Sequence, residues 1–115
     1  LKEVNFGVLE GLPCSFVDTL HLESTNWLED LKMDYTSYQG ENIDDVIIRQ
    51  QEALKEIEKE SHEKDCIVVV GHGCSLYALI KTLLKNEKIA FPENASAYIL
   101  CKKNNEYKLE NYLRP

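Results

Sequence analysis

The sequence of 115 residues lacks the features that mark several classes of protein. No apolar run approaches the length of about 20 residues that a membrane-spanning helix needs, and the first residues lack a signal-peptide pattern. The Lys and Arg residues are scattered without a basic stripe, and the net charge is -7. We therefore expect a cytoplasmic protein that binds neither a membrane nor nucleic acid.

The four cysteines lie far apart, and their spacing excludes two further classes. The four cysteines form no C-x-x-C pair, so the sequence predicts reduced thiols rather than a disulfide framework or a zinc site. No other cluster of His, Cys, Asp or Glu has the spacing of metal ligands, so we expect no metal requirement and no cofactor. The sequence also begins with Leu1 rather than Met, which indicates an incomplete chain.

What the sequence does contain is a pattern of alternating helices and strands. A helix is predicted over residues 43–61, with Asn42 as its N-cap, and a second helix over residues 76–84. The apolar, β-branched run Cys66–Val70 is typical of a buried strand of a parallel sheet. Residues 97–113 predict a β-hairpin that turns at two asparagines. This order indicates a single α/β domain over residues 1–115, with a mostly parallel sheet and flanking helices.

The region before residue 43 has a weaker pattern. Short helices are predicted over residues 16–22 and 25–31, after a glycine-containing loop over residues 1–16. Three aromatic residues in this region, Trp27, Tyr35 and Tyr38, either line a substrate lid or pack in the core.

The motif Gly71-His72-Gly73 lies where the predicted strand leads into the second helix. In α/β proteins this junction is where ligands bind, and a helix N-terminus suits an anion. Glycines there permit unusual φ angles and close backbone approach, and the histidine can bind phosphate or act as acid, base or nucleophile. The alternative interpretation is a structural turn with an exposed histidine.

Other motifs of strand-to-helix junctions do not fit this spacing. A dinucleotide-binding fingerprint requires a third glycine where Leu76 stands, and a P-loop requires Gly-Lys-Ser/Thr. A nucleophile elbow requires glycines two positions before and after the nucleophile, which neither Cys74 nor Ser75 has. Cys74 itself is read as a small half-buried residue rather than a redox-sensitive thiol.

Four segments, in order along the chain, resemble motifs of the histidine phosphatase superfamily, the phosphoglycerate mutase-like proteins. They are "LKEVNFGVLEGL", "GENIDDVIIR", "VVVGHGCSLYALI" and "FPENASAYIL". The resemblance implies a phosphoglycerate mutase-like fold and phosphoryl transfer through a phosphohistidine, with a small phosphorylated molecule as substrate. It implies that His72 is the second catalytic histidine and binds phosphate beside the Gly73 amide. Glu3 would be the catalytic acid/base.

The chain departs from the family pattern at its start. The family's nucleophile lies in an R-H-G motif, which is absent here, and neither His21 nor His62 is flanked by glycine. We therefore expect that the N-terminal strand and helices of the fold are missing, that the nucleophile lies outside this chain, and that these residues alone are inactive. Val4 stands where the mutases have Arg, which favours a phosphatase.

Three functions follow from these observations. The first is a metal-independent histidine phosphatase, present here as a fragment. The second is a non-catalytic, phosphatase-like binding module, and the third is an unrelated α/β interaction domain. For the first, we expect Glu3 and His72 to meet in one cleft at the carboxyl end of the strand Cys66–Val70. The sequence names neither the substrate nor the oligomeric state, with a homodimer as one arrangement.

Overall fold

The computed structural model describes residues 1–24, 26–85 and 87–115, and its longest element is helix α3, Ile43–Lys59. The helix begins at Asn42, whose side-chain oxygen accepts a hydrogen bond from the Asp45 N–H at 2.9 Å. Acidic residues in the first turn match the positive end of the helix dipole. The predicted helix over residues 43–61 is therefore confirmed, with Glu60 as its C-cap.

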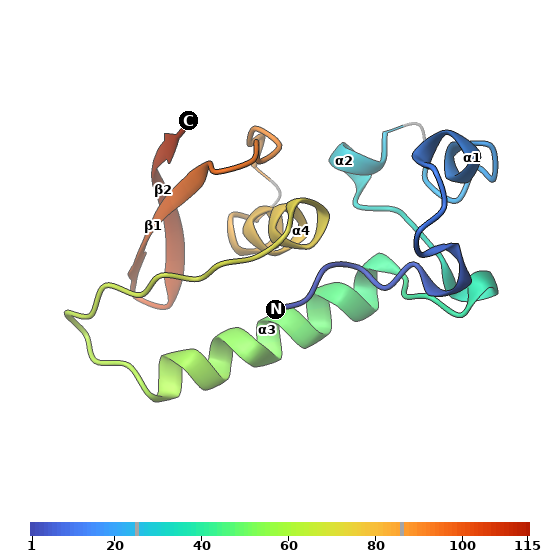
Figure 1. The fold of residues 1–115 in the computed structure, drawn as a ribbon. Helices are drawn as coiled ribbons and strands as arrows, with labels where there is room; N and C mark the ends of the chain where they lie inside the picture. The colour runs from blue at the N-terminus through green and yellow to red at the C-terminus, as the bar shows by residue number, and fades with distance from the viewer. Residues whose placement is uncertain (25, 86) are drawn as a thin grey trace.

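Helix α4, Gly73–Leu83, packs beside α3 (Figure 1). It begins earlier than predicted, because the His72 carbonyl accepts a hydrogen bond from the Leu76 N–H at 2.8 Å. No residue of α4 is exposed, and the five consecutive residues 77–81 are all buried, so the helix is covered on every side rather than on one face. None of the helices in the described residues combines the length and the apolar character needed to cross a lipid bilayer.

The first 40 residues form short elements joined by turns. These are the 3-10 helix η1 (Gly7–Leu9), helices α1 (Cys14–Asp18) and α2 (Trp27–Asp30), and the 3-10 helix η2 (Thr36–Tyr38). α1 lies further toward the N-terminus than the predicted helix over residues 16–22. α2 falls within the predicted range 25–31, whose first residue, Thr25, is outside the described residues.

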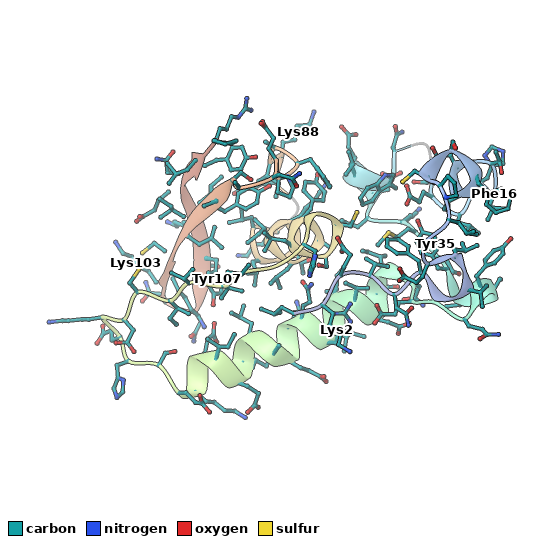
Figure 2. The ribbon with its side chains drawn as sticks, in the orientation of Figure 1. Lys2, Phe16, Tyr35, Lys88, Lys103 and Tyr107 are labelled. Carbon is teal, nitrogen blue, oxygen red and sulfur yellow. The ribbon has the colours of Figure 1, made fainter. Side chains whose placement is uncertain are left out.

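The hydrophobic core joins this N-terminal region to both long helices. Its buried members are Val4, Leu9, Met33, Tyr35, Ile43, Val46 and Ala78. Figure 2 shows Tyr35 inside this part of the molecule and Phe16 at its outer surface, in agreement with their exposures of 1% and 50%. The sequence assigned three aromatic residues either to a substrate lid or to the core, and Tyr35 is therefore a core residue.

The predicted hairpin is confirmed. Strand β1 (Ala97–Lys103) pairs antiparallel with β2 (Glu106–Leu113). Asn104 and Asn105 form the turn with φ angles of 52° and 60°, the left-handed region that asparagine tolerates. The stacked rings of Tyr98 and Tyr112, 4.8 Å apart, link the two strands.

The predicted strand Cys66–Val70 is wrong for the described residues, and so is the mostly parallel sheet. The segment is irregular, and Val68 and Val70 are 84% and 82% exposed. Cys66 is exposed rather than buried. The two-stranded antiparallel hairpin is the only sheet in the part of the chain that the structure describes. A β-branched run favours extended backbone but becomes a strand only beside a hydrogen-bonding neighbour, and the described residues place none there.

Candidate active site

The Glu3 carboxylate lies at the N-terminus of α4, directly after the Gly-His-Gly motif. Its Oε1 accepts a hydrogen bond from the Ser75 N–H at 2.9 Å, and its Oε2 accepts one from the Cys74 N–H at 3.3 Å. Oε1 also accepts a bond from the Val4 N–H at 2.9 Å. A carboxylate at this position satisfies amides that the helix leaves unpaired and faces the positive end of its dipole. Glu3 thus reaches the helix that His72 starts.

His72 is the N-cap residue of α4, with an extended backbone (φ -116°, ψ 160°). Its side chain makes no capping hydrogen bond and is exposed. Its carbonyl accepts bonds from the Leu76 N–H and, at 3.4 Å, from the Ser75 hydroxyl. The backbone at His72 is therefore fixed by the helix, while the imidazole faces solvent.

The two glycines of the motif do not use the conformational freedom that the sequence predicted. Neither has a positive φ, and a Cβ on Gly71 would make only ordinary contacts with Leu76. A Cβ on Gly73 would stand 3.4 Å from the ring of Phe91. This is also an ordinary contact distance, so neither glycine has a steric requirement in the structure.

Phe91 belongs to an aromatic cluster with Trp27 and Tyr77. The ring centroids of Phe91 lie 6.2 Å from Trp27 and 5.4 Å from Tyr77. Tyr77 is buried and donates its hydroxyl to the Leu28 carbonyl at 2.9 Å. Trp27 therefore lies near Gly73 through Phe91, which is compatible with a place at the edge of the candidate site.

Cys74 is half-buried, as the sequence predicted. Burial, together with the nearby carboxylates of Glu3 and Glu23, raises the pKa of its thiol to about 12. A thiol with this pKa holds its proton at neutral pH and is a poor nucleophile.

A cavity of about 180 Å³ lies next to α1. It is lined by Val17, Asp18, His21, Leu22, Glu23, Ser24 and Tyr35. Glu3 and His72 are not among these residues, so this cavity is not the predicted cleft. No group of three His, Cys, Asp or Glu side chains in the described residues has the arrangement of a metal site.

The structure also shows an ion pair beside the candidate site that the sequence reasoning did not select, that of Glu41 and Arg49. The Arg49 Nε lies 2.7 Å from Glu41 Oε1. The bonds from Arg49 hold the pKa of Glu41 below its ordinary value, and the bonds to Glu41 raise the pKa of Arg49. The signal in the sequence is the G-E helix start with an arginine two turns later.

The comparisons with known proteins give one match. A sequence model described as "Histidine phosphatase superfamily (branch 1)" matches residues 1–113. No curated protein and no solved structure gives a significant match to the chain.

Proposed function

The chain belongs to the histidine phosphatase superfamily, and from this membership we propose that it is part of a phosphatase acting on a small phosphomonoester. The observation that supports this proposal is the hydrogen bonding of the Glu3 carboxylate to the amides of Cys74 and Ser75. It brings the proposed acid to the first turn of the helix that begins with the proposed phosphate ligand, His72.

Each residue has a distinct role in the proposed reaction. The His72 imidazole and the Gly73 amide bind phosphoryl oxygens at the N-terminus of α4, where the helix dipole favours negative charge. Glu3 supplies the proton that the leaving alkoxide needs. Phosphoryl transfer depends mainly on positioning and on neutralising the spreading charge, so groups held by a helix terminus suit it.

The proposal assigns the nucleophile to neither of the other histidines. The His62 side chain is 90% exposed and lies beside Asp65, in the turn after α3. His21 lines the cavity next to α1. We therefore propose that the nucleophile is supplied from outside residues 1–115, and that these residues bind phosphate without turning over a substrate.

Binding and turnover test this proposal separately. Phosphate binding to residues 1–115 is followed by ³¹P NMR for the unmodified chain, for His72→Ala and for the control His62→Ala. We expect weaker binding in His72→Ala alone. Equal affinity in all three would contradict the role of His72.

Turnover is tested on the complete gene product with p-nitrophenyl phosphate. We expect hydrolysis that His72→Ala reduces and that survives EDTA. Phosphate binding without turnover by the complete product would instead favour the non-catalytic binding module. Robust turnover by residues 1–115 would show that the nucleophile lies within them.

A further inference from the structure

The G-E…R motif at the start of α3 contacts the segment that carries Glu3. Arg49 donates from Nε and Nη2 to the two carboxylate oxygens of Glu41, at 2.7 and 2.9 Å. The same guanidinium donates from Nη1 to the Lys2 carbonyl at 3.1 Å and from Nη2 to the Glu3 carbonyl at 2.9 Å. Figure 2 shows Lys2 beside α3, where these bonds form. One side chain on a long helix thus fixes two consecutive carbonyls of the N-terminal segment.

Glu41 fixes the same segment on the other side of Glu3. Its Oε2 accepts a hydrogen bond from the Asn5 N–H at 2.9 Å, and its own N–H donates to the Asn5 carbonyl at 2.8 Å. Together, Glu41 and Arg49 hold the main chain at Lys2, Glu3 and Asn5. The backbone on both sides of the Glu3 side chain is therefore bound, to Arg49 on α3 and to Glu41 just before this helix.

The residue types at this contact are the ones that it requires. A planar guanidinium matches a carboxylate in two parallel bonds and still has donors for carbonyls, which a lysine cannot do. A Cβ on Gly40 would lie 2.5 Å from the Asn5 carbonyl oxygen, so a glycine must precede Glu41. The pair is partly buried, with side-chain exposures of 29% for Arg49 and 21% for Glu41.

We propose that Glu41 and Arg49 are positioning residues, which hold the Glu3 carboxylate at the N-terminus of α4. The proposal rests on the proposed function, in which Glu3 is the proton donor. The path is short and continuous: Arg49 binds the Glu3 carbonyl, and the Glu3 carboxylate binds the amides of Cys74 and Ser75. Without the hydrogen bonds of Glu41 and Arg49, the Glu3 side chain would sample positions that do not face the substrate oxygen. Proton transfer would then be slower, because the carboxyl group would seldom be within reach.

An ordinary stabilising ion pair on α3 is the competing explanation, and the chain offers a matched control for it. Lys102 pairs with Glu58 on the same helix at 2.8 Å, with side-chain exposures of 34% and 29%. The hydrogen bonds of this second pair do not lead to Glu3. Lys102→Gln therefore removes an ion pair of similar exposure and leaves the Glu3 segment intact.

The first test reads the position of Glu3 without requiring activity. In residues 1–115, the ¹⁵N–¹H resonance of the Ser75 amide is followed through a pH titration, since this amide donates to the Glu3 carboxylate. Glu3→Gln identifies the part of the profile that belongs to Glu3. We expect Arg49→Gln to lose most of the Glu3-dependent change in the Ser75 resonance. Arg49→Lys should retain some of this change, and Lys102→Gln should retain all of it.

The outcomes decide between the two explanations. A folded Arg49→Gln variant with an unchanged Ser75 profile overturns the proposal. If Arg49→Gln does not fold, Glu41→Gln is read in the same way, because it keeps an oxygen for the Asn5 amide while it removes the charge. An unchanged profile there overturns the proposal equally. This readout is independent of whether the protein is a phosphatase.

The second test uses the complete gene product and two substrates. A p-nitrophenolate leaving group departs without a proton, whereas an alkoxide requires one. We expect Arg49→Gln to lower kcat more for an alkyl phosphate than for p-nitrophenyl phosphate, with KM little changed, and Lys102→Gln to affect neither. Equal losses on the two substrates would assign Arg49 a structural role only.

Discussion

Two regions of this molecule differ in whether their apolar side chains are buried. In the clamped region, residues 1–50 with α4, residues far apart in the chain meet in one buried core. In the open region, residues 62–71 with the hairpin β1–β2, Val68 and Val70 are among the most exposed apolar side chains. The difference shows that hydrophobicity alone does not create a core. A helix satisfies its own backbone hydrogen bonds and can then pack, whereas an extended segment needs a neighbour first.

Thiol reactivity compares the two regions most directly. At pH 8, we expect iodoacetamide to modify exposed Cys66 rapidly and Cys74 much more slowly, because Cys74 is half-buried and its surroundings raise its thiol pKa to about 12, which leaves little of the reactive thiolate. Peptide mass spectrometry over time measures both rates. Exposed Cys14 serves as the rapid control. Protection of Cys66 to the level of Cys74 would show that the open region is covered in solution.

Two isoleucines on α3 test the core of the clamped region. Ile43 is 4% exposed and Ile48 is 56% exposed. We expect Ile43→Ala to lower the free energy of unfolding by about 2–5 kcal/mol, from lost burial and a residual cavity, and Ile48→Ala by about 0.5 kcal/mol. Urea denaturation measures both. Similar losses at the two positions would contradict the division of α3 into a buried and an exposed face.

The turn of the clamped region depends on Gly7, where φ is 61° and an added Cβ would stand 1.9 Å from the Tyr38 carbonyl oxygen. Gly11 has a φ of 80° and open space around it. We expect Gly11→Ala to lower the free energy of unfolding by about 1 kcal/mol, from backbone strain alone. Gly7→Ala should lower it by about 3 kcal/mol, because the backbone at Gly7 and the backbone at Tyr38 must also move apart. Thermal unfolding compares the variants, and equal costs would place the segments further apart than described.

The ion pair of the clamped region predicts a pH dependence. The Glu41 pKa is lowered in the folded state by its bonds from Arg49, so the stabilisation is present above the ordinary pKa of 4.5 and is lost as pH falls through the folded value. We expect Arg49→Gln to cost about 1 kcal/mol at pH 7 and clearly less at pH 3. Urea unfolding at the two pH values measures this, and an equal cost at both would exclude the charge as its cause.

The open region predicts the smallest effect. Because Val68 is 84% exposed, Val68→Ala should change the free energy of unfolding by no more than about 0.5 kcal/mol. Val46, with 0% exposure, is the matched valine of the clamped region. We expect Val46→Ala to cost several times more. A large cost at Val68 would show that the apolar segment is buried against a partner in solution.

The sequence predicted the elements whose stabilisation is local. Helix α3 was readable from the Asn42 cap and the spacing of its apolar residues, and the hairpin from its two asparagines. The strand Cys66–Val70 was not, because its state depends on a neighbour rather than on its own residues. Propensity shows that a segment favours extended backbone but not what lies beside it.

For the candidate site, the sequence indicated which residues to consider, and only the structure shows which of them are in contact. The resemblance selected Glu3 and His72, residues far apart in the chain, but could not show that Glu3 bonds to the amides of α4. The role of Arg49 was hidden for another reason. Its partners include main-chain carbonyls of Lys2 and Glu3, and any residue type provides a carbonyl, so no side-chain pattern marks the contact.

The bond between Glu3 and Ser75 also has a consequence for synthesis, because it spans 72 positions of the chain. At a translation rate of about 5–20 residues per second, roughly 4–14 s pass between the addition of these two residues. Arg49 is made within that interval and can hold the Glu3 carbonyl while α4 is still unmade. The Glu3 side chain is thus made several seconds before the helix whose amides it binds.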